Sequence, residues 1–127
     1  MSVYKSILPS LLLMPVRMGV GAYGLFIVWV SLRPAGTGGA VPHLDKVLHL
    51  LVYAILAVGI SLGWPRLSKF RIFLGCVLFG ASMEMGQALI GSGRTASLWD
   101  GVANSLGAAL GIYLVILMER FFALKTN

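Results

Sequence analysis

Four long apolar stretches separated by short polar segments constrain this chain more than any other feature of its sequence. They cover roughly residues 16–32, 47–64, 70–90 and 99–122, and few charged residues lie inside them. At a rise of about 1.5 Å per residue, helices of this length can cross a hydrocarbon core of about 30 Å, the shortest with local thinning. Backbone groups in such a core must be hydrogen-bonded within the segment. We therefore predict an all-α fold: a four-transmembrane-helix bundle, with residues 1–127 as a single domain.

The composition supports a membrane protein and argues against a nucleic-acid-binding one. The chain is 58% hydrophobic and only 11% charged, and its net charge of +6 comes from basic residues that lie between the apolar stretches. Basic residues in that position indicate membrane topology, so we expect no nucleic-acid partner. Residues 2–14 are apolar but interrupted by Lys5 and Pro9, and we expect them at the membrane interface. Cys76 is the one cysteine, which excludes an intrachain disulfide.

The distribution of basic residues predicts the orientation of the bundle. Seven of the ten fall on the side shared by both termini and the middle loop, and three fall on the other side. The seven are Lys5, Arg17, Arg66, Lys69, Arg71, Arg120 and Lys125, and the three are Arg33, Lys46 and Arg94. Positively charged loops stay in the cytoplasm, so we predict that both termini are cytoplasmic.

Polar residues gather toward the outer ends of three predicted helices, and each set shares one helical face. The sets are Asp45, His49 and Tyr53; Gly80, Glu84, Gln87 and Gly91; and Asp100, Asn104, Gly107 and Gly111. Residues three or four positions apart lie on the same face of a helix. Lys46, Arg94 and Ser97 fall at the same depth, and three of the four carboxylates belong to this region. An ionisable residue within a bilayer is costly unless paired, so we predict a functional site here.

The charged members of these sets also have structural interpretations. Glu84 could form an ion pair with Arg94 or with Lys46, which would neutralise a charge within the membrane. Asp45 and Asp100 fall near predicted helix starts, where aspartate is a common N-cap. Their shared location is the observation that these interpretations explain poorly.

The uncharged members have structural interpretations too. Gln87 and Asn104 could form hydrogen bonds between helices, and His49 could be a hydrogen-bonded packing residue. Gly107 and Gly111 form a small-residue motif that promotes close helix packing, and we assign no chemistry to it.

The order and spacing of these residues resemble the VanZ-like family of integral membrane proteins over about residues 30–115. The matching motifs are Asp45-Lys46-x-x-His49, Glu84-x-x-Gln87 and Arg94-x-x-Ser97-x-x-Asp100-x-x-x-Asn104-x-x-Gly107-x-x-x-Gly111. The resemblance implies a multi-pass protein of the bacterial inner (cytoplasmic) membrane. The family's namesake is associated with resistance to the glycopeptide antibiotic teicoplanin, and no agreed biochemical activity comes with the name. The residues that it carries over as ligand-binding candidates are Asp45, Lys46, His49, Glu84, Gln87, Arg94, Asp100 and Asn104.

We expect this site to bind or handle an anionic lipid or a lipid-linked envelope precursor, with bilayer lipids as its surroundings. Lys46 and Arg94 can contact a phosphate, and the amides that begin the second and fourth helices favour anions. The outward face is also where cell-wall assembly takes place.

Two other functions fit the same residues. A membrane-embedded hydrolase or transferase would use Glu84 and His49 as acid and base. A non-catalytic subunit would complete its site in a homo-oligomer or a larger membrane complex. We expect binding rather than catalysis, with no cofactor and no metal. A metal site would need His49 with two or three of Asp45, Glu84 and Asp100, and this oxygen-rich set would suit Mg²⁺ or Mn²⁺.

Overall fold

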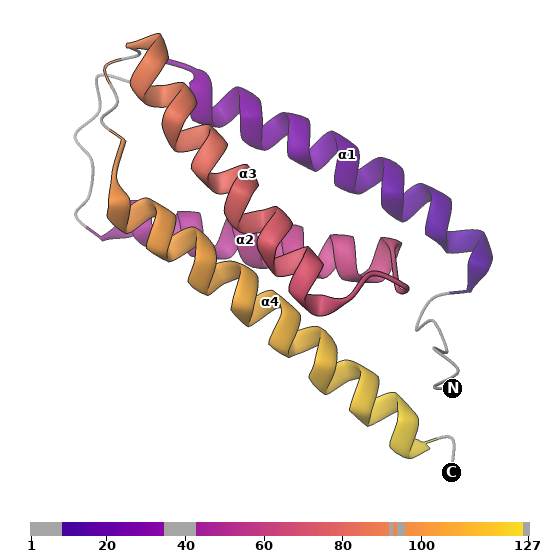
Figure 1. Ribbon diagram of the computed structural model, residues 1–127. Coiled ribbons are helices and arrows are strands. Elements are labelled where there is room, and N and C mark those ends of the chain that lie inside the picture. Colours follow the sequence, from indigo (N-terminus) through magenta and orange to yellow (C-terminus); the bar gives the residue numbers. More distant parts are fainter. Residues whose placement is uncertain (1–8, 35–42, 92, 94–95, 126–127) are drawn as a thin grey trace.

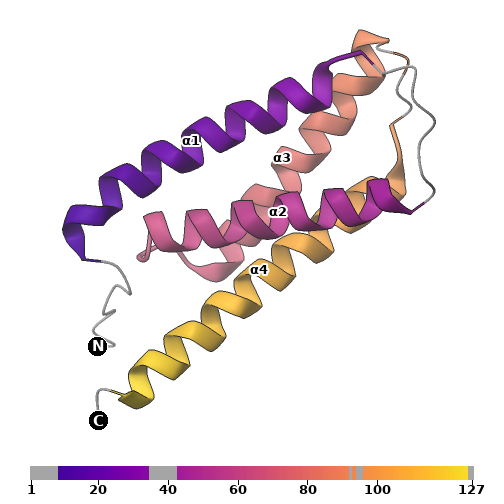
Figure 2. The same cartoon turned by 180° about the vertical axis from the view of Figure 1, so that it is seen from behind.

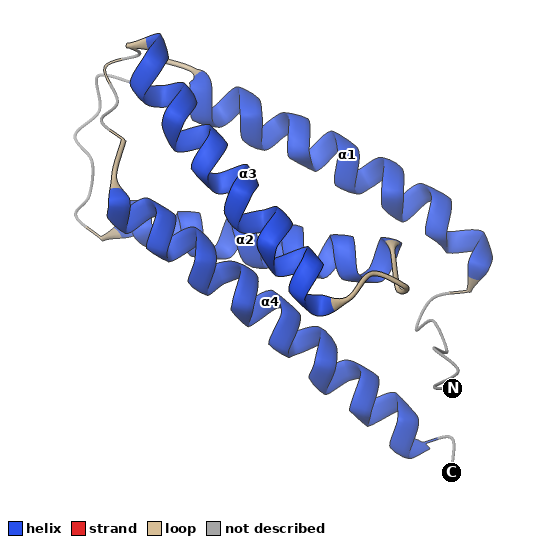
Figure 3. Ribbon diagram, viewed as in Figure 1, coloured by secondary structure: helices blue, strands red, loops and turns tan. Residues whose placement is uncertain are grey.

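The computed structural model describes residues 9–34, 43–91, 93 and 96–125 of the 127-residue chain. This part of the chain contains four α-helices and no strand (Figure 3). They are α1 (Ser10–Leu32), α2 (Leu44–Gly63), α3 (Lys69–Ile90) and α4 (Leu98–Lys125). All four are long and apolar enough to cross a membrane. The prediction of an all-α membrane protein with four spanning helices is therefore confirmed.

The helix boundaries match the predicted spans closely except at the starts of α1 and α2 and at the end of α4. Helix α1 begins at Ser10 and takes in part of the segment expected at the interface, with Pro15 inside the helix. Pro15 lacks the N–H that would bond the Leu11 carbonyl, and the helix continues in spite of that loss. Helix α3 is bounded by local signals. The Ser68 hydroxyl accepts a hydrogen bond from the Arg71 N–H, and Gly91 adopts a left-handed conformation with φ of 63°.

The helices alternate in direction, so their ends form two separate clusters (Figures 1 and 2). One cluster contains Leu32, Leu44, Ile90 and Leu98, where α1 and α3 end and α2 and α4 begin. We call it the polar end. At the opposite, terminal end, α1 begins and α4 finishes, and the last turns of α4 extend beyond the other helices. The start of α1 and the end of α4 therefore lie on the same side of the bundle.

Close contact between α2 and α4 depends on two glycines. A methyl group at Gly107 would overlap the backbone carbonyl of Leu50, and one at Gly111 would overlap that of Ala54. The small-residue motif of α4 therefore lets the two helix backbones approach each other, as such motifs do in membrane proteins. This contact fixes the relative rotation of α2 and α4, which positions the polar residues one or two turns closer to the polar end.

The distribution of side chains suits a lipid environment. Ala57 and Ala108 are fully buried, whereas the larger Leu25 and Leu78 are 72% and 59% exposed. Small residues at helix contacts and large apolar residues outside are expected where the surrounding solvent is itself apolar.

Polar contacts also hold the helices together at the terminal end. The guanidinium of Arg17 in α1 donates to the carbonyl of Gly63 at the end of α2, at 2.8 Å. Lys69 of α3 forms an ion pair with Glu119 of α4 at 2.7 Å. Glu119 is the carboxylate that the sequence placed away from the predicted site, and this ion pair gives it a structural role.

Candidate polar site between α1, α2 and α4

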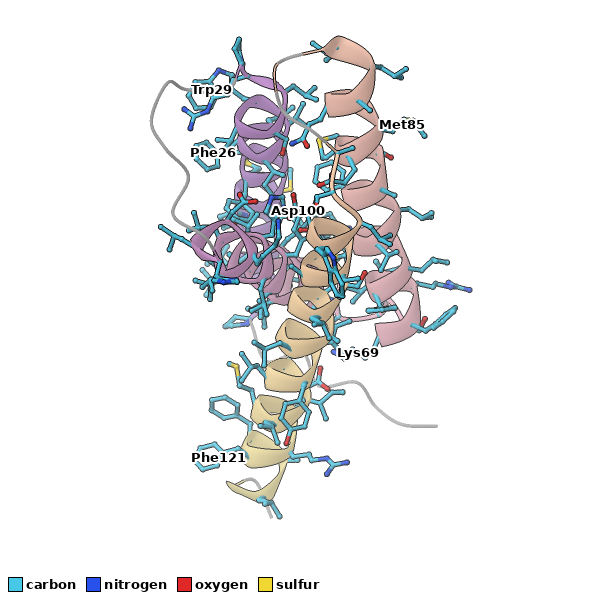
Figure 4. The ribbon with its side chains drawn as sticks, turned by 90° about the vertical axis from the view of Figure 1, so that its left-hand side faces the viewer. Phe26, Trp29, Lys69, Met85, Asp100 and Phe121 are labelled. Carbon is cyan, nitrogen blue, oxygen red and sulfur yellow. The ribbon has the colours of Figure 1, made fainter. Side chains whose placement is uncertain are left out.

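Five of the predicted site residues meet where α2 and α4 begin. Asp45, Lys46 and His49 come from the first two turns of α2, and Asp100 and Asn104 come from the first two turns of α4. Figure 4 shows Asp100 directed among the helices, whereas Phe26 and Trp29 extend outward from α1. Asp45 and Asp100 lie inside the first turn of their helices rather than at the N-cap, which is His43 in α2. The capping interpretation is therefore wrong, although a carboxylate in the first turn still interacts favourably with the helix dipole.

Lys46 bridges the two aspartates. Its ammonium donates to a carboxylate oxygen of Asp100 and lies 3.3 Å from an oxygen of Asp45. Asp100 is 6% exposed, so its charge needs a partner within the protein. Lys46 supplies one positive charge for two negative charges. Its charge is therefore already compensated, which weakens the expectation that Lys46 contacts a phosphate.

His49 is oriented by Asn104 and faces both aspartates. One ring nitrogen, Nδ1, lies 2.9 Å from Oδ1 of Asn104, an oxygen to which it can donate a hydrogen bond. The other, Nε2, lies 3.7 Å from Asp45 and 3.8 Å from Asp100. Donor atoms of Asp45, His49 and Asp100 all lie within 4.8 Å of one another, so these three residues could hold a metal ion. A set of one nitrogen and two carboxylates would suit Mn²⁺ or a similar divalent ion.

Glu84 makes a different set of contacts. One carboxylate oxygen accepts a hydrogen bond from the backbone N–H of Ser97 at 2.9 Å, which ties α3 to the residue that precedes α4. The other oxygen is buried without a hydrogen-bond partner. The ion pair of Glu84 with Lys46, one of the structural alternatives, is not formed because Lys46 binds the two aspartates. Arg94, its other suggested partner, lies outside the described residues.

Gln87 connects α3 to α1. It is 5% exposed, and its side-chain amide donates to the backbone carbonyl of Ser31 at 3.1 Å. This contact corresponds to the interhelical hydrogen bonding suggested by the sequence. His49 and Glu84, the suggested acid and base, bind different groups, Asn104 and the Ser97 amide respectively.

A cavity of about 180 Å³ adjoins these residues between α1 and α2. Its apolar lining consists of Phe26, Ile27, Val30, Leu48 and Val52, and its polar lining of Ser31, Arg33, Asp45, His49, Tyr53 and Gln87. Arg33 and Ser31 were not predicted as site residues, and Tyr53 was placed in a polar set but not among the ligand-binding candidates. Tyr53 shares a helical face with His49, which is the signal that could have identified it. Arg33 follows the first span immediately, at the depth of the polar sets.

Three buried side-chain atoms in the described part of the chain lack a hydrogen-bond partner. They are the hydroxyl oxygens of Tyr53 and Ser61 and the second carboxylate oxygen of Glu84. Buried polar groups are rarely left in this state, so each one needs an explanation. Tyr53 is distinct from Ser61 because it also lines the cavity.

Four apolar helices, with Gln87, Asp100 and Asn104 buried toward one end, define a multi-pass integral membrane protein. The family model described as VanZ/LLP1 matches residues 4–119 of the chain. The chain therefore belongs to the VanZ family, and the resemblance found in its sequence motifs is confirmed. No curated protein and no solved structure shows significant similarity to it.

Proposed function

We propose that this VanZ-family protein binds the headgroup of a membrane amphiphile, an anionic lipid or a lipid-linked envelope precursor. The cavity between α1 and α2 is the observation that carries the proposal. It combines an apolar wall with polar and charged groups near the polar end, a combination suited to a molecule with both parts. Phe26 and Leu48 in its lining are 52% and 51% exposed, so the cavity lies close to the lipid-facing surface.

Arg33 is the residue best placed to bind the anionic group. It lines the cavity, it is exposed, and its guanidinium lies 5.4 Å from the centre of the Trp29 ring. A guanidinium can bind a phosphate through two parallel hydrogen bonds. Lys46, in contrast, is engaged by Asp45 and Asp100. Among the described residues, we therefore expect Arg33 rather than Lys46 to bind the phosphate.

Lipid binding by the purified protein would test this proposal. Native mass spectrometry of the full chain in detergent should detect tighter binding of phosphatidylglycerol than of phosphatidylcholine. Arg33→Gln should weaken phosphatidylglycerol binding by about 10- to 150-fold, since a charge-assisted contact contributes about 1.5–3 kcal/mol. Arg66→Gln is the matched control, because Arg66 is also exposed but lies between α2 and α3 at the terminal end. Equal weakening by both substitutions would contradict a specific site.

The proposal includes a cellular setting. The protein would lie in the bacterial inner membrane with both termini in the cytoplasm and the polar end facing outward. Handling of a lipid-linked envelope precursor on that face would connect it to the glycopeptide resistance of the family's namesake. A second copy of the chain or another membrane subunit could cover the lipid-facing side of the cavity.

A further inference from the structure

Asp45 and Asp100 each present their two carboxylate oxygens to two different groups. The ammonium of Lys46 contacts one oxygen of each, Oδ2 of Asp45 and Oδ1 of Asp100. The other oxygen of each faces Nε2 of His49, which lies 3.7 Å from Oδ1 of Asp45 and 3.8 Å from Oδ2 of Asp100. Lys46 therefore leaves one oxygen of each aspartate for a second cation.

The three atoms that face one another are all acceptors when His49 is neutral. Its Nδ1 carries the hydrogen that can be donated to Asn104, so Nε2 has a lone pair. Within the described residues, no donor forms a hydrogen bond with Nε2 or with either of the two oxygens. Their separations of 3.7 and 3.8 Å are too long for a hydrogen bond. Two ligands that each lie about 2.1 Å from one ion are about 3–4 Å apart, so a shared cation fits these separations better.

Charge and burial also favour a second cation. Two carboxylates and one ammonium leave one negative charge that Lys46 does not compensate. Asp100 is 6% exposed, so water contributes little to the solvation of its free oxygen. Asp45 and His49 line the cavity between α1 and α2, which gives an ion a path to the site and leaves room for water ligands.

We propose that Asp45, His49 and Asp100 bind a divalent cation of the Mn²⁺ type at the wall of the cavity. This site goes beyond the proposed headgroup binding and replaces the expectation, drawn from the sequence, of no metal. Donor atoms of the three residues lie within 4.8 Å of one another, so small side-chain shifts bring them to one ion. One imidazole nitrogen and two carboxylate oxygens suit Mn²⁺. Asn104 holds the ring through Nδ1, as the second nitrogen of a metal-binding histidine is commonly held.

Electron paramagnetic resonance of the untagged full chain in detergent tests the site, with Mn²⁺ as the probe. The wild type should bind Mn²⁺ saturably, and a pulsed measurement should detect coupling of the Mn²⁺ spin to a histidine nitrogen. His49→Asn should abolish that coupling and weaken Mn²⁺ binding by about 10- to 100-fold, the loss found even for groups that only orient a ligand. An asparagine amide keeps a donor close to the position of Nδ1 and has no atom at Nε2, so the contact with Asn104 can persist.

Two matched controls come from the same chain. His43 is the other histidine and lies at the N-cap of α2, outside the three ligands. Its left-handed backbone conformation accommodates asparagine, so His43→Asn should keep both the affinity and the nitrogen coupling. Asp45→Asn should weaken Mn²⁺ binding as His49→Asn does. Glu119→Gln, which removes a carboxylate at the terminal end, should leave the affinity unchanged.

Melting temperatures without Mn²⁺ show whether each variant is folded, and Asp45→Asn decides the matter if His49→Asn does not fold. Added Mn²⁺ should raise the melting temperature of the wild type and of both controls, because a ligand of the native state stabilises it. The inference is overturned if the wild type binds no Mn²⁺ saturably, if the nitrogen coupling survives in His49→Asn, or if Asp45→Asn binds no more weakly than Glu119→Gln. None of these measurements involves a lipid, so failure of the proposed headgroup binding would leave this result standing.

Discussion

Lys46 of α2 and Asp100 of α4 form an ion pair across the α2–α4 interface at the polar end of the bundle. Asp45, one residue before Lys46, shares the same ammonium group. The pair lies within the first turn of each helix, and its acidic member is almost completely buried. Lys46 therefore lowers the free-energy cost of burying the Asp100 carboxylate within the membrane region. It also links two helices that are far apart in sequence.

Removing the ammonium should destabilise the protein. Lys46→Met leaves Asp100 buried without its partner, which we expect to cost about 1–3 kcal/mol. Lys46→Met combined with Asp100→Leu removes both charges and should recover most of that loss. Thermal unfolding in detergent measures the effect, and equal melting temperatures for the wild type and Lys46→Met would contradict the structural role of the pair.

The close approach of α2 and α4 gives a second prediction. Gly107→Ala should destabilise the bundle by about 1–3 kcal/mol, because the added methyl group forces the helix away from the Leu50 carbonyl. Gly101→Ala, in the same helix, has open space around the added group and should be neutral or stabilising. Detergent melting temperatures of the two variants provide the comparison. Equal changes would show that the contact at Gly107 can relax.

The sequence predicted the parts of the structure that depend on local rules. Span length and apolar composition predicted the four helices. Spacings of three and four residues predicted which polar residues share a helical face. The starts of α1 and α2 were predicted several residues late, since apolar patterns do not mark the first turn, and for that reason Asp45 was interpreted as a cap. Asp100 was interpreted as a cap because it falls at the predicted start of α4, although it lies inside the first turn.

The contacts between helices could not be predicted in the same way. Spacing places His49 and Tyr53 on one face of α2, but the partner of each depends on how neighbouring helices are rotated. Lys46 could equally have reached Glu84, and the choice of Asp100 follows from the contact that Gly107 permits between α2 and α4. The cavity has the same origin, because its lining comes from α1, α2 and α3 together.

The membrane orientation gives a third prediction. In a background with Cys76 replaced by alanine, Ala96→Cys places a thiol at the polar end and Arg66→Cys places one at the terminal end. Both positions are exposed. An impermeant maleimide added to intact spheroplasts should label Ala96→Cys and not Arg66→Cys, because basic loops remain in the cytoplasm. The reverse pattern would place the polar end in the cytoplasm, and both positions should react after permeabilisation.

The final prediction separates two contributions of Glu84 to stability, its hydrogen bond to the Ser97 amide and its negative charge. One of its oxygens holds the Ser97 amide, and a glutamine can accept that hydrogen bond through its own side-chain oxygen. Glu84→Gln should therefore keep a melting temperature close to that of the wild type. Glu84→Leu removes the acceptor, leaves the Ser97 N–H without it, and should cost about 1–3 kcal/mol. Thermal unfolding of both variants in detergent is the measurement. If Glu84→Gln were as destabilised as Glu84→Leu, the negative charge itself would hold the fold together, and an ion pair of Glu84 would then be its main role.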